Sequence, residues 1–526
     1  MDAHDRLIQA LTEPSVYEHA TTEIRVLQTH ISWVVLTGPY AYKVKKPVNL
    51  GFVDFSTLAK RHFFCQAELR LNRRLAPQLY LAVVAIYGTP ERPCLQLQGA
   101  PIEYAVKMRQ FAQDTLLSHC IEAGQLLGAH IDRLAHVVSA FHAGIATADP
   151  RSRFGTPEVI YQPVQDNFQH LFDTMADPVR QAHARELAAW CQRTFAARRS
   201  AVVARKRDGF VRECHGDMHL GNMILLDDDV VIFDCLEFND ALRWIDVASD
   251  VAFLVMDLED RRRPDLAQRF LNAYLEATGD YGALVLLPFY LTYRATVRAK
   301  VAGIRLGQHA LPREEAQRAR EAFGSYLDLA ERYTQPSRPR LFITHGVSGS
   351  GKTSLTQPLV EATGAIRIRS DVERKRFFGV APLERSTDRS ARNLYTPDVT
   401  ERTYAHLAQQ ARRIVEAGYA VVVDATFLRR AQRAMFRRLA AQLGVPFTIL
   451  AFRAPTEILR GRVARRSAQG NDASEADLVV LNGQLETLEG ITAAEQAYTV
   501  TIDSAAPQAP QRLLDAVRAM GVGPAI

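Results

Sequence analysis

Three oxygen-bearing side chains near the middle of the chain have the types and the spacing needed to handle phosphate. Asp217 and Asn222 lie in the stretch His215-Gly216-Asp217-Met218-His219-Leu220-Gly221-Asn222, and Asp234 follows shortly after it. Phosphoryl transfer needs a carboxylate near the acceptor hydroxyl and oxygen ligands for Mg²⁺ beside the phosphates. We therefore predict that Asp217 acts on the acceptor and that Asn222 and Asp234 bind Mg²⁺.

A second phosphate-binding pattern lies farther along the chain. The stretch Gly346-Val347-Ser348-Gly349-Ser350-Gly351-Lys352-Thr353 fits the P-loop pattern G-x-x-x-x-G-K-[ST] at every position. The backbone N–H groups of such a loop surround phosphates, and the helix that follows it adds a favourable field. The predicted phosphate-binding residues are Gly346, Ser348, Gly349, Ser350, Gly351 and Lys352. Thr353 is a predicted Mg²⁺ ligand, and so is Asp424, which ends an apolar stretch.

Regular elements must position these two groups of residues. Residues 223–226 and 230–234 read as strands around the turn Asp227-Asp228-Asp229, so the hairpin would bring Asn222 beside Asp234. In the C-terminal part, apolar strands alternate with helices. The expected strands are 341–345, 366–369, 420–424, 447–452 and 498–502, and the clearest helices are 399–417 and 429–443. Strict alternation of this kind favours a parallel sheet covered on both faces.

A change in composition divides the chain. The stretch Tyr333-Thr334-Gln335-Pro336-Ser337-Arg338-Pro339 combines two prolines with polar neighbours, which is typical of a linker. We predict one domain over residues 1–335, with a small lobe over 1–108 and a mainly helical large lobe over 109–335, and a second domain over 340–526. Within the large lobe, a helix over 243–257 would place Asp246 and Asp250 one turn apart, either to cap the helix and orient the catalytic loop or to bind a cationic substrate.

The composition limits the class of protein. The 526-residue chain is 47% hydrophobic and 23% charged, so each half can bury a core. Its net charge of +6 comes without a long basic run, which weighs against nucleic acid as a partner. The six cysteines form no C-x-x-C pair, which favours a reducing compartment. The start of the chain lacks an apolar signal segment, and no apolar run reaches the ~20 residues of a membrane span, so we expect a cytoplasmic protein.

The first group of residues resembles the aminoglycoside and choline phosphotransferase family of the protein-kinase-like fold. That family has the pattern H-G-D-x-H-x-x-N followed by I-D-x-x-E. The matching residues are His215, Gly216, Asp217, His219, Asn222, Asp234 and Glu237, with Phe233 in place of the Ile. The resemblance implies a bilobal domain that uses ATP and Mg²⁺, with a strand Lys on the α- and β-phosphates and a helix Glu that orients it. Lys43 and Glu68 fit these roles, and Lys45 remains an alternative to Lys43 because it faces the same way along the strand.

The second group resembles small P-loop kinases of the polynucleotide-kinase, gluconate-kinase and zeta-toxin type. The resemblance implies that Asp371 is the base or orienting residue for an acceptor hydroxyl, with Arg374 or Lys375 binding an anion nearby. Arg462 and Arg466 share a helix face, where this family places arginines that stabilise the transferring phosphoryl group. Helix capping by Asp371 and a solvated arginine face are the alternative explanations.

The order of the two parts resembles bacterial bifunctional proteins that join an aminoglycoside phosphotransferase-like part to a P-loop ATP-binding part. The implied fold has two domains of α/β and α+β class, a protein-kinase-like bilobal domain followed by a parallel-sheet P-loop NTPase domain. The implied activity is ATP- and Mg²⁺-dependent transfer of the γ-phosphoryl group to the alcohol groups of small molecules at two nucleotide sites. Two alternatives stay open. The C-terminal part could be a polynucleotide 5′-hydroxyl kinase, or the N-terminal part could be a ligand-sensing module that regulates the P-loop part. The acceptors, the coupling of the parts and the oligomeric state stay open as well.

Overall fold

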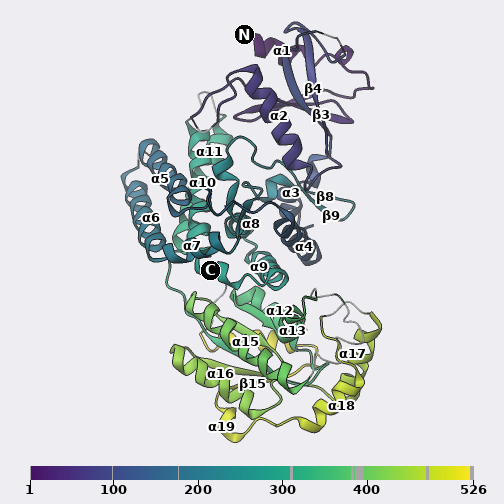
Figure 1. Cartoon of the computed structure of the whole chain (residues 1–526), viewed down its shortest axis with the longest axis vertical. Helices are drawn as coiled ribbons and strands as arrows, with labels where there is room; N and C mark the ends of the chain where they lie inside the picture. Colours follow the sequence, from purple (N-terminus) through teal and green to yellow (C-terminus); the bar gives the residue numbers. More distant parts are fainter. Residues whose placement is uncertain are drawn as a thin grey trace. The chain divides into compact units, whose positions relative to one another are not determined.

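The computed structural model shows two compact units. It describes residues 2–51, 53–96, 99–175, 177–307, 312–380, 384, 396–469 and 473–521. The first unit comprises residues 1–133, 140–166 and 202–257, and the second comprises residues 134–139, 167–201 and 258–526. Figure 1 colours the elements along the sequence. The second unit therefore contains helices that precede the predicted linker together with the P-loop region, and the boundary at 335–340 stays a prediction.

The first unit contains an antiparallel sheet in the order β1-β2-β3-β6-β4-β5. Its strands are β1 Arg25–Gln28, β2 Ser32–Leu36, β3 Tyr40–Lys45, β4 Tyr80–Thr89, β5 Arg92–Cys94 and β6 Glu103–Arg109. Val35, Val44 and Ala105 lie in a buried cluster on one face of the sheet, against helix α1 (Ala3–Ala10). Helix α2 (Leu58–Asn72) carries Glu68 and contacts β4 and β6. The sheet and α2 therefore place Lys43, Lys45 and Glu68 near one another, as the sequence predicted.

A hairpin lies beside this sheet. Strand β8 (Met223–Leu226) pairs with β9 (Asp229–Ile232), and the turn residues Asp227 and Asp228 both have positive φ. That backbone is required by the turn type whose twist matches a two-residue hairpin, and Asp adopts it more readily than most residues. Ile224 and Val231 pack into the cluster that contains Val106 and Tyr80. The predicted hairpin is confirmed, with a second strand that ends two residues earlier than expected.

The expected helix over 243–257 is wrong in its first turn. Residues Trp244–Asp246 form strand β10, which pairs with β7 (Val211–Glu213), and helix α8 begins only at Val247 and ends at Asp260. The pairing with β7 joins residues far apart in the sequence, and a local periodicity cannot reveal it. Asp246 and Asp250 are consequently not on consecutive turns of one helix. The other helices that begin in this unit are α3 Leu117–Glu122, α4 Gly128–Gly144 and α5 Pro157–Thr174, whereas α7 Arg199–Arg207 begins in residues of the second unit and continues into the first.

A parallel sheet organises the C-terminal part of the second unit. The strand order is β12-β13-β11-β14-β15, and the pairs are parallel throughout. The strands are β11 Leu341–His345, β12 Ile366–Arg369, β13 Val421–Asp424, β14 Phe447–Arg453 and β15 Thr499–Asp503. The helices between and after them are α12 Lys352–Thr363, α13 Ser370–Phe377, α15 Pro397–Glu416, α16 Arg430–Leu443, α17 Thr456–Gln469, α18 Leu478–Thr487, α19 Ala493–Gln496 and α20 Ala509–Arg518. The predicted alternation and the fold class are confirmed.

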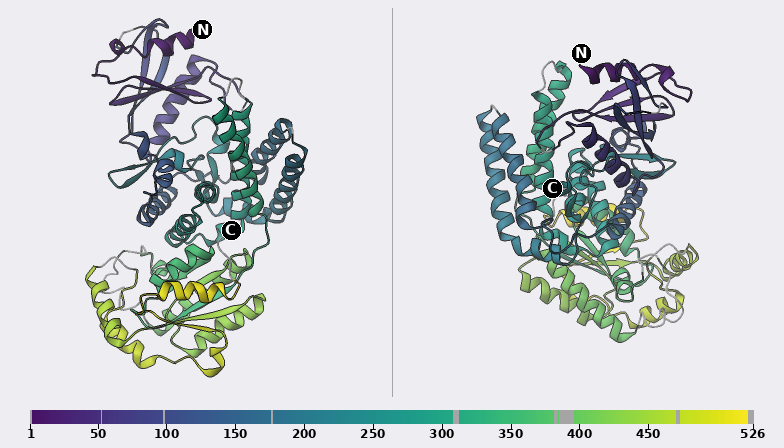
Figure 2. Two further views of the ribbon diagram at one scale, coloured as in Figure 1. Left: turned by 180° about the vertical axis from the view of Figure 1, so that it is seen from behind. Right: turned by 45° about the horizontal axis from the view of Figure 1, so that its top comes forward.

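The two faces of this sheet are covered by different helices. Leu359 of α12 and Leu513 of α20 share a buried cluster with Phe342, Val422 and Leu450. Figure 2 shows α20, in yellow, along this face. Helices α15 and α16 contact the strands from the other side. Burial on both faces explains why the strands read as apolar runs without alternation.

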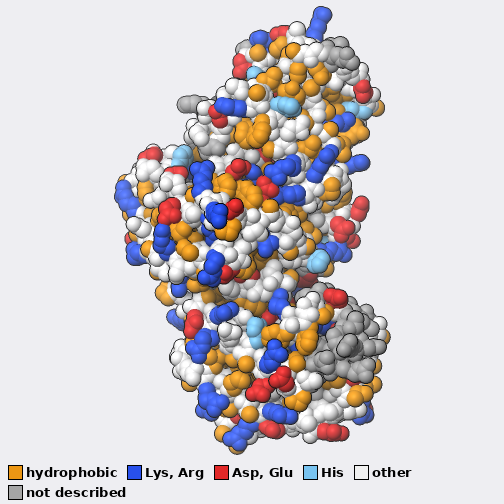
Figure 3. Space-filling model, in the orientation of Figure 1, with side chains coloured by type: hydrophobic (Ala, Val, Ile, Leu, Met, Phe, Trp, Pro, Cys, Tyr) orange, Lys and Arg blue, Asp and Glu red, His pale blue; other side chains and the backbone are white. Residues whose placement is uncertain are grey.

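The same unit contains a helical part from earlier in the chain. Its helices are α6 Pro178–Ala197, α9 Pro264–Thr278, α10 Leu287–Leu306 and α11 Arg313–Arg332, with the 3₁₀ turn η5 Tyr281–Val285 between α9 and α10. Helix α10 packs along α11, and α9 contacts α12 and β12. Among the described residues, no helix combines the length and the apolar character that crossing a membrane requires. On the face drawn in Figure 3, basic and acidic side chains are interspersed.

Candidate functional site

Two acidic side chains hold the predicted catalytic loop around Asp217 by accepting hydrogen bonds from its backbone. The backbone N–H groups of His215 and Gly216 donate to the two carboxylate oxygens of Asp250, at 2.8 and 2.9 Å. The N–H of Leu220 donates to Asp257 at 2.8 Å. Both acids lie on α8 and are fully or almost fully buried. Of the roles considered, the contacts of Asp250 show the orientation of the loop. Asp246 instead accepts from the N–H of Ala248 at the start of α8, at 2.9 Å, and pairs with Arg205 at 2.6 Å.

The loop places polar groups around the Asp217 carboxylate. Asn222 Nδ2 donates to Asp217 Oδ2 at 3.0 Å, and His219 Nε2 lies 3.4 Å from the same oxygen. His215 is buried, and its Nε2 donates to the carbonyl of Phe233 at 2.9 Å. Burial lowers the pKa of His215, which favours the neutral ring, and the ring links the loop to the hairpin through Phe233. The side chain of Asp217 is 40% exposed and can meet an acceptor.

The hairpin brings Asp234 to the same place. The N–H of Phe233 donates to the carbonyl of Asn222 at 2.9 Å, so the start of the first strand and the end of the second lie together. Asp234 has a φ of +61°, and its N–H donates to the hydroxyl of Tyr80 at 3.2 Å. Its carboxylate remains 40% exposed. Asp217, Asn222 and Asp234 thus form one oxygen-rich group, as the spacing predicted.

Two lysines of β3 share one glutamate. Lys43 Nζ lies 2.8 Å from Glu68 Oε1 and 2.5 Å from Asp234 Oδ1, while Lys45 Nζ lies 2.7 Å from Glu68 Oε2 and also pairs with Glu237. Burial alone would lower the pKa of Lys43, but Asp234 and Glu68 raise it well above its ordinary value. Lys43 therefore reaches the predicted metal-binding carboxylate, whereas Lys45 has no exposed surface.

The P-loop has the strand–loop–helix setting that its pattern requires. It connects β11 to α12, and Gly346, Gly349 and Gly351 all have positive φ. At Gly349 a side chain is excluded, because a Cβ atom there would lie 2.8 Å from the carbonyl oxygen of Leu459. Backbone N–H groups at a helix N-terminus bind phosphate well, so the loop is a candidate phosphate site.

Lys352, Thr353 and Asp424 lie at the mouth of this loop. Lys352 Nζ donates to the carbonyls of Gly346 and Val347, at 2.9 Å each. Thr353 Oγ1 donates to Asp424 Oδ2 at 2.6 Å. Asp424 ends β13, which is paired with β11 beside the loop. A hydroxyl and a carboxylate in contact offer the hard oxygen ligands that Mg²⁺ takes. Thr353 and Asp424 thus lie together, and their binding of Mg²⁺ stays a prediction.

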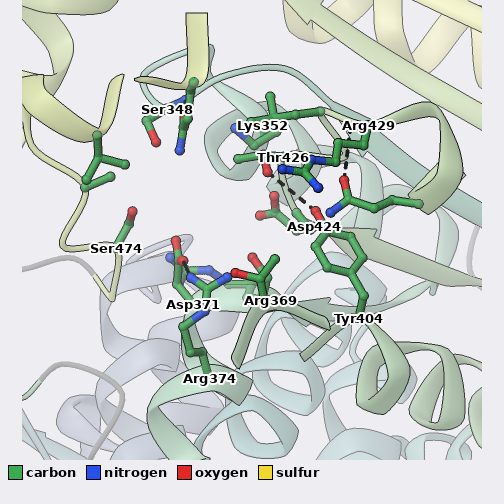
Figure 4. Close-up of a pocket in the computed structure, with 18 of the residues that line it drawn as sticks. Ser348, Lys352, Arg369, Asp371, Arg374, Tyr404, Asp424, Thr426, Arg429 and Ser474 are labelled. Atoms are coloured by element: carbon green, nitrogen blue, oxygen red, sulfur yellow. Dashed lines mark hydrogen bonds and ion pairs between the residues drawn. The ribbon is translucent and has the colours of Figure 1, made fainter. Parts of the chain in front are cut away.

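A cavity of about 600 Å³ opens in front of the loop. Ser348 and Lys352 lie on one side of it, and Asp371 and Arg374 lie on the other (Figure 4). Asp371 pairs with Arg374 at 3.1 Å, and its side chain is 26% exposed. The structure thus brings Asp371 to the cavity that the P-loop borders, although Asp371 follows β12 and the P-loop follows β11.

The predicted arginines of α17 divide between two places. Arg466 lines the cavity and donates to the carbonyl of Ala476 at 3.0 Å. Arg462 is not among the residues that line it, and its guanidinium donates to Ser504 and to the carbonyl of Gly349 at 3.2 Å, behind the loop. Lys375 is 2% exposed and pairs with Glu475 at 3.0 Å, so Arg374 is the member of the pair 374–375 that faces the cavity.

Several cavity residues escaped the sequence reasoning. They are Arg369, Tyr404, Arg429 and Gln484. Gln484 Oε1 accepts a hydrogen bond from the N–H of Ser348 at 2.7 Å, although it comes from α18, far along the chain. A single Arg, Tyr or Gln has no distinguishing sequence pattern. Only Arg369 could have been predicted as a site residue, because it is the last residue of the strand 366–369.

Family models match both parts of the chain. A model of the phosphotransferase enzyme family matches residues 59–287, and a model of an AAA domain matches residues 341–491. The uncharacterized protein Rv2004c of Mycobacterium tuberculosis (strain ATCC 25618 / H37Rv) is 30% identical over 451 residues, which cover 86% of this chain and 88% of that relative. The uncharacterized protein Mb2027c of Mycobacterium bovis (strain ATCC BAA-935 / AF2122/97) matches with the same identity and coverage.

Solved structures match each part separately. A gluconokinase from Sinorhizobium meliloti 1021 is 24% identical, with a TM-score of 0.26, and the match covers 35% of this chain and 94% of that one. A choline/ethanolamine kinase family protein from Mesorhizobium loti is 13% identical, with a TM-score of 0.37, covering 62% of this chain and 98% of that one.

The matched family models make this chain an enzyme of the kinase-type phosphotransferase class. It belongs to the same family as these mycobacterial relatives, and in this chain the segment that matches the phosphotransferase enzyme family precedes the P-loop segment.

Proposed function

We propose that the protein has two ATP- and Mg²⁺-dependent sites, each transferring the γ-phosphoryl group of ATP to a hydroxyl group of a small molecule. The observation that carries the proposal is the cavity in which Asp371 lies opposite Lys352. Such a cavity has the volume of a small-molecule site, and its acidic and basic groups lie on opposite sides. The reacting groups of two substrates could meet there.

At the P-loop site, each residue has a distinct role. Lys352 neutralises charge on the β- and γ-phosphates, and Thr353 and Asp424 bind Mg²⁺. When bound, Mg²⁺ supplies further charge neutralisation on the phosphates. Asp371 accepts the hydrogen bond of the acceptor hydroxyl and takes its proton as the new P–O bond forms and the bond from the γ-phosphorus to the leaving ADP breaks. Arg466 faces the cavity and stabilises the transferring group.

At the first site, the corresponding roles fall to residues of one unit. Asp217 orients the acceptor hydroxyl, Asn222 and Asp234 bind Mg²⁺, and Lys43, oriented by Glu68, contacts the α- and β-phosphates. The ion pair of Lys43 with Asp234 supports this assignment, because it joins the phosphate-contacting cation to the metal site. Lys45 supports the same glutamate from its buried side.

The acceptor of the second site carries negative charge in this proposal. Arg369, Arg374, Arg429 and Arg466 line the cavity together. Arginine recognises carboxylate and phosphate groups through paired hydrogen bonds, which favours a hydroxyl compound with an anionic group. A 5′-hydroxyl oligonucleotide meets the same description, so it is included in the test below.

The test is a screen of ATP consumption by the full chain with sugars, sugar acids, aminoglycosides, nucleosides and 5′-hydroxyl oligonucleotides. Asp217→Asn and Lys352→Ala assign each stimulated activity to one site. We expect each variant to remove a different activity. A chain whose ATP consumption is unaffected by both substitutions would refute the two-site proposal. Stimulation by oligonucleotides alone would replace the small-molecule acceptor of the second site.

A further inference from the structure

One edge of the parallel sheet, at β12, is covered by a side chain from outside the P-loop region. Strand β12 is the last strand of the sheet, so the backbone groups on its outer side have no strand partner within the described residues. Asn272 of α9 lies there. Its Oδ1 accepts from the N–H of Arg367 at 2.7 Å, and its Nδ2 donates to the carbonyl of Ala365 at 3.1 Å.

These are the two groups that a residue opposite Ile366 would bond in a neighbouring parallel strand. The amide of Asn272 therefore substitutes for a strand, and it is 4% exposed. Exposed sheet edges are otherwise sites of unwanted pairing. Helix α9 thus completes the hydrogen bonding of β12 near its start.

The same helix also contacts the end of β12. Glu276 Oε1 lies 2.9 Å from Arg369 Nη1, and Arg369 lines the cavity. Arg376 of α13 donates to the backbone carbonyl of Glu276 at 2.7 Å, at the C-terminus of α9. A Cβ atom at Gly279 would lie 2.8 Å from Arg376 Cζ, so this approach depends on a glycine with a φ of +73°. Helices α9 and α13 are therefore joined at their ends.

Helix α13 has two faces with different partners. Asp371 and Arg374, which pair with each other, face the cavity. On another face, Glu373 is 1% exposed; it accepts from Tyr281 of η5 at 3.4 Å and pairs with His406 at 2.9 Å. A rotation of α13 as a whole, which would carry Asp371 away from the cavity, would break the contacts of Glu373 and Arg376.

We propose that α9 and η5 are part of the second active site, with Asn272, Glu276 and Tyr281 as positioning residues for Asp371 and Arg374. These positioning residues lie within the segment 59–287 that matches the phosphotransferase family. A segment of one enzyme family thereby completes the acceptor half of a site that belongs to another. The role of Asp371 in this inference rests on the function proposed above, whereas the positioning itself does not.

Hydrogen exchange measured by mass spectrometry on the full chain tests the positioning. Asn272→Leu and Glu276→Gln remove contacts to β12, and Arg269→Ala is the matched control, because Arg269 of the same helix pairs with Glu361 of α12 at 2.9 Å. Loss of the Asn272 hydrogen bonds or of the Glu276 ion pair is expected to speed amide hydrogen exchange in residues 366–377 about tenfold. Exchange in residues 346–353 stays unchanged, and the control changes neither segment. Unchanged exchange over 366–377 in both variants overturns the proposal, and so does equal acceleration of the P-loop.

ATP hydrolysis with water as the acceptor supplies a readout that a general loss of stability would not give. It is measured in the full chain with Asp217→Asn, which silences the first site. Glu276→Gln is expected to lower kcat by up to about a hundredfold with an unchanged KM for ATP, as displacement of a reacting group does. When Glu276→Gln is combined with Asp371→Asn, kcat should not fall below that of Asp371→Asn alone. An additive fall, or a raised KM with unchanged kcat, contradicts positioning. If Asp371→Asn itself leaves kcat unchanged, the proposed function fails, while the exchange experiment still decides the positioning.

Discussion

Thr353 and Asp424 are in direct contact, with 2.6 Å between the threonine hydroxyl and a carboxylate oxygen. The two residues come from α12 and β13, and both are proposed to bind the same Mg²⁺. Thr353→Ala removes one oxygen ligand, so the Mg²⁺ concentration for half-maximal activity of the second site should rise about tenfold, for a loss of about 1.4 kcal/mol. Titration of activity with Mg²⁺ at saturating ATP measures this half-maximal concentration. Thr353→Ser, which keeps the hydroxyl, is the control. Equal Mg²⁺ requirements in all three proteins would contradict the metal site.

The Asp217 carboxylate should contribute strongly to phosphoryl transfer at the first site and only slightly to the binding of ATP there. Asp217→Asn keeps the size of the side chain and removes its ability to take a proton. We expect kcat of the first site to fall about 10²- to 10⁴-fold, the range for a positioned acid or base. Calorimetric titration with a non-hydrolysable ATP analogue should find its affinity nearly unchanged. If transfer persists at the original rate, Asp217 has another role.

Lys43 and Lys45 are expected to fail in different ways. Lys45→Met leaves Glu68 and Glu237 buried without their shared cation, which costs about 3–5 kcal/mol in comparable buried pairs. Lys43→Met removes the cation next to the exposed Asp234 carboxylate, so ATP binding at the first site should weaken more than stability falls. Thermal unfolding and ATP titration of the two variants compare these effects. The reverse pattern would make Lys45 the phosphate-contacting lysine.

Gln484 competes for a backbone group of the P-loop. Its side chain accepts the hydrogen bond of Ser348 N–H, a donor that the loop would otherwise direct at a phosphate. Gln484→Ala removes this competitor, and ADP should bind to the second site a few-fold more tightly, because about 0.5–1.5 kcal/mol is the net value of such a bond. Fluorescence titration with a labelled ADP measures the change. A weaker affinity would mean that Gln484 contacts the nucleotide itself.

Stability should depend on pH through Glu259. Burial raises the pKa of Glu259 to about 7 from an ordinary 4.5, although Tyr333 donates to its carboxylate at 2.5 Å. The folded protein therefore binds a proton that the unfolded chain releases between these values, and stability falls as pH rises from about 4.5 to about 7. The full effect is about 3 kcal/mol. Glu259→Gln should flatten this part of the profile relative to the unmodified chain, as measured by unfolding at pH 5 and pH 8. Parallel profiles would show that the carboxyl is ionised throughout.

Local patterns were sufficient for much of the site. The P-loop, the hairpin that joins Asn222 to Asp234, and the strand end at Asp424 all depend on residues close in sequence, and the structure has them as expected. The pairing of β10 with β7 depends on contacts between distant segments, and it replaced the first turn of an expected helix. Arg462 shows a different limit: helical spacing grouped it with Arg466, but could not reveal that its guanidinium would contact Gly349 and Ser504 while Arg466 lines the cavity.

The amide of Asn272 also has a consequence for how the chain is made. Because synthesis proceeds from the N-terminus, α9 has left the ribosome before the strand that it covers. The nascent β12 therefore meets a ready partner as soon as it emerges, and it has less time as an open template for other chains. We therefore expect that a permuted chain, made in the opposite order, would leave this strand edge uncovered for longer during synthesis.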